Sequence, residues 1–178
     1  MPGIVQSTSG ILAGWQPRKD STAASDAKIL NEALGSEFGA VAAYQVAADS
    51  GLLQKPVLDV AIKFQGQHQA HADFLVSTVK TLGGKPAEPK KAADYNFPTG
   101  TLKTQVDVLR FGAGLEQAAA RAYLGMITVL EDRELAKAMA SILGDETMHW
   151  AILRQVLGEE PVPSAFPITW DDPRARQH

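Results

Sequence analysis

Four separate stretches of this 178-residue chain repeat apolar residues at spacings of three and four, and this pattern constrains the fold more than any other feature. The stretches are residues 30–48, 57–82, 102–130 and 135–156. A helix with one apolar face must bury that face against a neighbour, so four such helices are expected to share one core. The sequence therefore predicts an all-α protein built as a four-helix bundle.

The two halves of the chain resemble each other. Glu37 precedes Tyr44 by seven residues, and Glu116 precedes Tyr123 by the same interval. Residues 68–71 read His-Gln-Ala-His and residues 146–149 read Glu-Thr-Met-His, at an offset of 78 residues. A repeated helical hairpin explains this correspondence. The connection over residues 84–100 contains three prolines and is long enough to run the length of a bundle, so we expect two helical hairpins joined by one long crossover.

The two ends of the chain lack helical periodicity. Residues 1–25 are rich in glycine, proline, serine and threonine and are expected to form an irregular arm, with Ser25 or Asp26 capping the first helix. Residues 26–158 are expected to form the bundle as a single domain. Residues 159–178 contain four prolines and are expected to form an extended tail.

Composition excludes several classes of protein. The net charge of −3 gives no electrostatic reason to expect a nucleic acid partner. The absence of cysteine excludes disulfides and thiolate metal ligands. No apolar run reaches the roughly 18 residues of a membrane span, and no signal peptide is recognisable, so we expect a cytoplasmic protein without a membrane partner. Export stays open for a protein whose signal has been removed.

Six ionisable residues occupy helical positions where the pattern calls for apolar ones. They are Glu37, His68, His71, Glu116, Glu146 and His149. A buried carboxylate without a partner or a metal is costly, and residues three apart, such as Glu146 and His149, share a helix face and can bind one ion together. Three carboxylates and three imidazoles at matching heights suit iron, manganese or zinc rather than calcium. The alternative is a decayed site, in which the same residues form a hydrogen-bonded polar cluster.

Three further residues are candidates for supporting roles. Tyr44 and Tyr123 lie two turns beyond their glutamates on the same apolar stripes. They are expected to pack in the core, or alternatively to orient metal ligands or supply an electron to a redox metal. Asp145, beside Glu146, is expected either to accept a hydrogen bond from a ligand histidine or to face solvent.

The pattern of two single glutamates and a Glu-x-x-His motif resembles the ferritin-like superfamily of di-iron carboxylate proteins. It is most similar to bacterial ferritin-like domain proteins of unassigned role, and the resemblance covers residues 26–158. It implies that Glu37 and Glu116 are terminal ligands, that Glu146 bridges two ions, and that the three histidines are nitrogen ligands.

The sequence departs from this family at His68, where a glutamate is typical. Imidazole does not bridge two ions as a carboxylate does, and three carboxylates supply −3 against +4 for two divalent ions. A single metal, zinc or a mixed site therefore becomes an alternative to two irons.

The resemblance implies a di-iron or di-manganese redox centre that reacts with dioxygen or peroxide, in a protein that forms a homodimer. Two iron ions are the first expectation, with manganese or zinc as alternatives. Such a protein would be a metal-dependent oxidoreductase if it is an enzyme, which the sequence leaves open. The alternative is a non-catalytic bundle with one structural metal or a vestigial site. A DNA-coating mini-ferritin is disfavoured, because the arm offers only Arg18 and Lys19 and no fifth helix follows.

Overall fold

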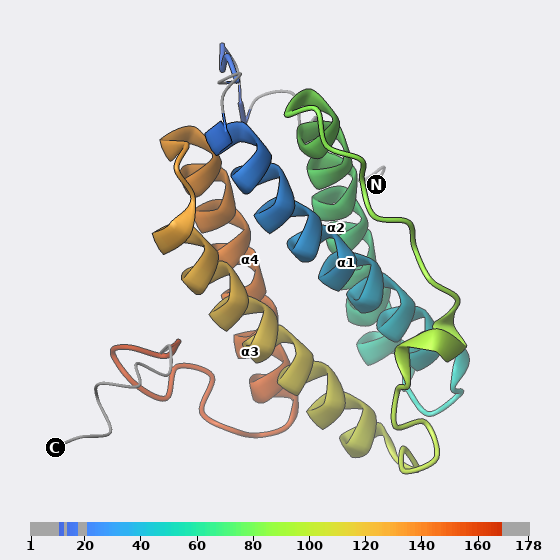
Figure 1. Cartoon of the computed structure of the whole chain (residues 1–178). Helices are drawn as coiled ribbons and strands as arrows, with labels where there is room; N and C mark the ends of the chain where they lie inside the picture. Colours follow the sequence, from blue (N-terminus) through green and yellow to red (C-terminus); the bar gives the residue numbers. More distant parts are fainter. Residues whose placement is uncertain (1–10, 13, 18–20, 169–178) are drawn as a thin grey trace, which may run out of the picture.

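Four long helices make up the protein in the computed structural model, which describes residues 11–12, 14–17 and 21–168 (Figure 1). They are α1 (Ser21–Asp49), α2 (Lys55–Thr81), α3 (Gln105–Val129) and α4 (Arg133–Val156). The connection from α2 to α3 contains one short 3-10 helix, η2 (Ala92–Tyr95). No strand occurs among the described residues. The predicted all-α bundle of two hairpins and one long crossover is confirmed.

Local sequence determines where the helices begin and end. Thr104 precedes α3 and forms a capping box with Asp107, each side chain accepting the other's backbone N–H. Asp132 caps α4 by accepting from the N–H groups of Glu134 and Leu135. Gly83 follows α2 with a φ of 80°, a left-handed conformation that a side chain disfavours, and thereby ends the helix.

The predicted start of the first helix was wrong, because α1 begins at Ser21 and residues 21–25 are helical. Asp26 is therefore not a cap of its own helix. It lies inside α1, 1% exposed, and its carboxylate accepts the backbone N–H groups of Glu131 and Asp132 at 3.0 and 2.9 Å. Asp26 thus satisfies the turn between α3 and α4, where these backbone donors have no helical partner.

The N-terminal arm contacts this same turn. The indole Nε1 of Trp15 donates to Asp132 Oδ2 at 2.8 Å, and Leu12 packs against the core. Residues 1–10, 13 and 18–20 of the expected arm, and residues 169–178 of the expected tail, lie outside the described residues. Residues 159–168 contain no helix or strand.

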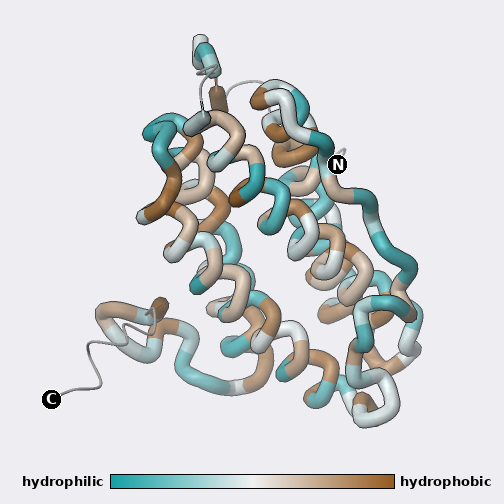
Figure 2. The backbone as a smooth tube through the Cα atoms, viewed as in Figure 1, coloured by the Kyte–Doolittle hydropathy of each residue, from teal (hydrophilic) through white to brown (hydrophobic). Residues whose placement is uncertain are grey.

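The core consists of two apolar clusters, one toward each end of the bundle. The first is built around Leu34, Leu75 and Met139, and the second around Phe64 and Trp150. Apolar and polar positions alternate along every helix, as the brown and teal segments of the tube show (Figure 2). No helix within the described part of the chain is long and apolar enough to cross a membrane. Between the two apolar clusters, at mid-height, lie five buried acidic and imidazole residues, namely Glu37, His68, Glu116, Glu146 and His149.

Candidate metal centre

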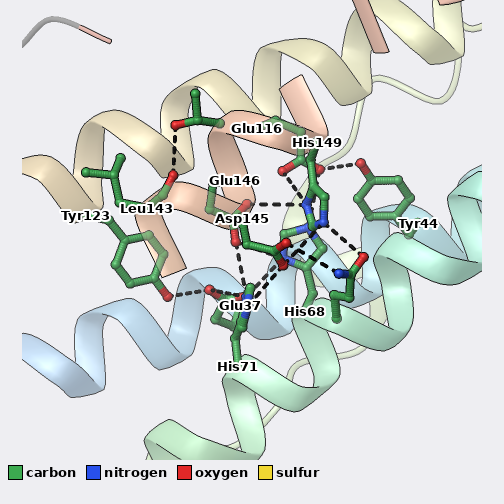
Figure 3. Close-up of polar contacts among 12 residues, drawn as sticks. Glu37, Tyr44, His68, His71, Glu116, Tyr123, Leu143, Asp145, Glu146 and His149 are labelled. Carbon is green, nitrogen blue, oxygen red and sulfur yellow. Dashed lines mark hydrogen bonds and ion pairs between the residues drawn. The ribbon is translucent and has the colours of Figure 1, made fainter. Parts of the chain in front are cut away.

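The six ionisable residues predicted from sequence converge at mid-height of the bundle, one from α1, two from α2, one from α3 and two from α4 (Figure 3). Five of them are almost fully buried, at 2% exposure or less. These five are Glu37, His68, Glu116, Glu146 and His149. The side chain of His71 is 15% exposed. Each helix therefore places an acidic or imidazole side chain on its inner face, as the spacing indicated.

His68 lies between the carboxylates of the two hairpins. Its Nδ1 is 2.9 Å from Oε2 of Glu37, and its Nε2 is 3.2 Å from Oε1 of Glu116. The two ring nitrogens thus point to carboxylates on α1 and α3 respectively. The ring also stacks on Tyr44, with centroids 5.4 Å apart.

Two groups of four residues have donor atoms close enough to share an ion. The first quartet is Glu37, His68, His71 and Glu146, and the second is His68, Glu116, Glu146 and His149. Within each quartet, one donor atom from every residue lies within 4.8 Å of the others. His68 and Glu146 belong to both quartets, and they occupy equivalent positions of the sequence repeat.

Glu146 is the least satisfied group in this cluster. It is 0% exposed, and neither carboxylate oxygen makes a hydrogen bond. His71 Nδ1 lies 3.1 Å from Glu146 Oε1, yet the approach lacks hydrogen-bond geometry and leaves this nitrogen unpaired as well. Buried lone pairs of this kind are costly unless a cation binds them. The oxygen and nitrogen donor set, and these unpaired atoms, fit a transition-metal site.

The two tyrosines bond across the bundle rather than to their own helices. The hydroxyl of Tyr44 on α1 donates to Glu116 on α3, and the hydroxyl of Tyr123 on α3 donates to Glu37 on α1. Both rings are buried, so each tyrosine packs in the core and also orients a glutamate. The two predicted alternatives for Tyr44 and Tyr123 are therefore not exclusive.

Asp145 lies at the histidine edge of the cluster, where its Oδ2 is 3.3 Å from Nε2 of His71 and 3.4 Å from Nε2 of His149. Its side chain is 19% exposed, so it both contacts the histidines and is partly open to solvent, which were the two alternatives predicted for it. An outer carboxylate of this kind fixes which imidazole nitrogen faces inward.

Gln67 is a residue that the sequence reasoning missed. Its Oε1 lies 3.1 Å from Nε2 of His149, and its Nε2 donates to Asp145 at 3.3 Å. Gln67 precedes His68 as Asp145 precedes Glu146, at the repeat offset of 78 residues. The repeat itself was therefore the signal that would have found it. The first hairpin thus has Gln67 and His68 at the positions where the second hairpin has the carboxylates Asp145 and Glu146.

Contacts with carboxylates raise the pKa values of two histidines of the cluster. Burial opposes a charge on His68, but hydrogen bonds to Glu116 and Glu37 outweigh it and raise the pKa to about 10. Burial likewise opposes a charge on His71, but its contacts with Asp145, Glu146 and Glu37 raise the pKa to about 11.

The three buried glutamates divide into two kinds. Burial raises the pKa of Glu146, and the neighbouring carboxylates of Glu116 and Glu37 raise it further despite the histidines. Burial also opposes ionisation of Glu37 and Glu116, but hydrogen bonds to the histidines prevail and lower both pKa values. These shifts favour charged His68 and His71 beside charged Glu37 and Glu116, and they favour a proton on Glu146.

Such a site, on two helical hairpins, defines a four-helix carboxylate–histidine protein. Residues 25–159 match the family described as Ferritin-like domain, and the chain belongs to this family. Among curated proteins, none matches the sequence.

Solved structures that share this fold include two of low sequence identity to the chain. One is a conserved hypothetical protein, rv2844, from Mycobacterium tuberculosis, which is 22% identical and superimposes with a TM-score of 0.68 over 83% of this chain and 100% of the other. The second is from Bacillus anthracis str. Ames and is described among ferritin like, diiron-carboxylate proteins. It is 21% identical, with a TM-score of 0.62 over 78% of this chain and 99% of the other.

Proposed function

We propose that the cluster binds two divalent transition-metal ions, iron before manganese, and reacts with dioxygen or peroxide. The observation that carries the proposal is the pair of buried quartets that share His68 and Glu146. Glu37 and His71 would hold one ion, Glu116 and His149 the other, and Glu146 would serve both. Iron, when bound by these residues, would supply the electrons for reduction of dioxygen or peroxide.

The protein residues around the ions would hold protons and exclude water. The Tyr44 and Tyr123 hydroxyls donate to the two terminal glutamates, and this withdraws negative charge from Glu116 and Glu37. Phe64 stacks on His149 with ring centroids 3.9 Å apart and covers one side of the second quartet. Asp145 and Gln67 fix the imidazoles of His71 and His149.

An anaerobic titration with Fe(II), followed by exposure to oxygen, tests this function. We expect two irons per chain and, after oxygen, the near-ultraviolet absorption of a ferric centre. Two irons bound with no spectral change on oxygenation would overturn the redox claim.

A second candidate is a non-catalytic bundle with one structural ion such as zinc. The observation that favours it is His68, whose two ring nitrogens already contact Glu37 and Glu116 and occupy the place of a second cation between them. In that case natively purified protein would contain one ion per chain, and removing the ion would lower the melting temperature without loss of any turnover. Elemental analysis with metal-per-chain stoichiometry separates the two candidates.

Metal binding is expected to release protons and to strengthen as pH rises. His68 and His71 have raised pKa values, about 10 and 11, and the pKa of Glu146 is also raised. All three are therefore expected to carry protons at neutral pH. An ion must displace protons from the atoms it binds, and each displaced proton makes affinity rise about tenfold per pH unit. Zinc calorimetry in buffers of different ionisation enthalpy, at about pH 6 to 8, measures this release. A pH-independent affinity would show that the ion binds elsewhere.

A further inference from the structure

A cavity of about 390 Å³ lies between α1 and α3 and reaches the metal centre. Glu37, His68 and Glu116 line its inner end. Its size falls within the range of pockets that bind small organic molecules. The cluster is therefore not sealed on this side of the bundle.

The walls of the cavity are made mainly of residues with very small side chains. Those on α1 are Ala33, Ser36, Gly39 and Ala40, and those on α3 are Ala118, Ala119 and Ala122. Because none of these side chains extends far, the two helices leave space between them instead of interlocking. Ser36, Ala118 and Ala122 are exposed, so the outer side of the cavity is open to solvent.

Aromatic residues of the crossover close one end of the cavity. Phe97 lines it, stacks on Tyr95 with centroids 5.5 Å apart, and meets Phe111 edge-on at 5.9 Å. The Tyr95 ring lies over Gly39, where an added Cβ would be 3.4 Å away. At the other end the lining residues are Tyr123 and Met126. The connection between the hairpins thus supplies one wall of the cavity.

The charges of the lining residues indicate which kind of molecule the cavity can bind. Apart from the residues of the metal centre, no charged side chain is among the described residues that line the cavity. An anion would meet the carboxylates of Glu37 and Glu116, and His68, the one lining residue that can carry a positive charge, already contacts both of them. A neutral apolar body matches the alanine and phenylalanine lining, and a hydroxyl at its inner end can donate to Glu37 or Glu116.

We propose that this cavity binds the organic substrate of the metal centre, an uncharged molecule with an apolar body and one hydrogen-bond donor. Its identification as the substrate site rests on the proposed function, whereas binding of such a molecule rests on the cavity alone. Ala119 and Ala122 on α3 are the positions where this binding can be blocked without altering any residue of the metal centre.

The test measures displacement of the neutral dye N-phenyl-1-naphthylamine from the full-length, metal-free protein. We expect 1-decanol to displace the dye and decanoate to do so far more weakly. Ala119→Phe should weaken both dye and decanol by about tenfold or more, because the ring occupies the cavity. Ala122→Phe should act in the same direction from an exposed position where folding is not at risk. Ala140→Phe, at an exposed alanine of α4 outside the cavity, is the matched control and should leave binding unchanged.

Metal content is measured on the same samples, so that the two proposals fail separately. Equal dye affinity in wild type and both cavity variants, or equal displacement by decanol and decanoate, would overturn the cavity proposal. Protein that binds decanol in the cavity but takes up no metal would overturn the metal-centre proposal instead. The cavity would then be a binding site, but not the substrate site of a metal centre. Normal metal uptake by Ala119→Phe, together with lost decanol binding, is the result that supports both.

Discussion

Replacing Glu146 with leucine is expected to abolish metal binding and, at the same time, to raise the melting temperature of the metal-free protein. Glu146 is the only carboxylate common to both quartets, so its loss removes a donor from each ion. The affinity should fall by more than the roughly 10- to 100-fold that loss of an outer partner causes.

The gain in stability follows from the unpaired oxygens of Glu146. They are buried, make no hydrogen bond and adjoin two other carboxylates. Leucine has a similar volume and needs no polar partner, and a buried polar group left without a hydrogen bond costs about 1–3 kcal/mol, so its replacement by an apolar side chain is expected to be stabilising. For a chain of this length, 1–2 kcal/mol raises the melting temperature by roughly 2–8 °C.

Thermal unfolding with and without metal measures both effects. Glu32→Leu is the matched control, because Glu32 is exposed on α1 and should change neither property appreciably. A fall in the metal-free melting temperature of Glu146→Leu would mean that Glu146 is satisfied within the apo protein, contrary to its geometry. Undiminished metal uptake would exclude both quartets as the site.

The substitution His68→Glu is expected to strengthen metal binding and to destabilise the metal-free protein, which is the opposite of what is expected for Glu146→Leu. It places a fourth carboxylate in the cluster, so that −4 balances the +4 of two divalent ions. We expect the second ion to bind more tightly, by about 10- to 100-fold, since a carboxylate can serve both ions while imidazole offers one nitrogen to each side.

Without metal, the same substitution should destabilise the protein. His68 contacts Glu37 and Glu116, and replacing it leaves those carboxylates facing another acidic group rather than a cation. Breaking a buried ion pair in this way costs about 3–5 kcal/mol. The difference in melting temperature between metal-loaded and metal-free protein should therefore widen.

The double variant Gln67→Asp/His68→Glu, which gives the first hairpin the residues of the second, should widen this difference in melting temperature further. His68→Gln, which is neutral and adds no charge, is the control. An unchanged second-ion affinity in His68→Glu would show that charge at this position does not limit occupancy.

The repeat made much of the site predictable from sequence. Glu37, His71, Glu116 and His149 were located because a buried ionisable residue interrupts an apolar stripe at the same register in each half. Helical spacing is local, so the face on which a side chain lies can be read without knowing the neighbouring helix. The crossover followed from the length and proline content of the connection.

Partners across the bundle were not predictable in the same way. Asp26 has the composition of a helix cap, but its carboxylate serves backbone donors more than 100 residues away. Tyr44 and Glu37 share one stripe, yet each bonds to a residue of α3. Which residues meet across the interface depends on how the hairpins are placed against each other, and helical periodicity carries no information about that.

His68 and Glu146 also imply something about how the protein moves. Each hairpin contributes one of these residues to the quartet that is otherwise built from the other hairpin. An ion in either quartet would therefore tether the two hairpins, and any breathing motion that separates them would loosen both ions together. Metal exchange would then proceed at the rate at which the bundle opens, and metal loading would slow that opening.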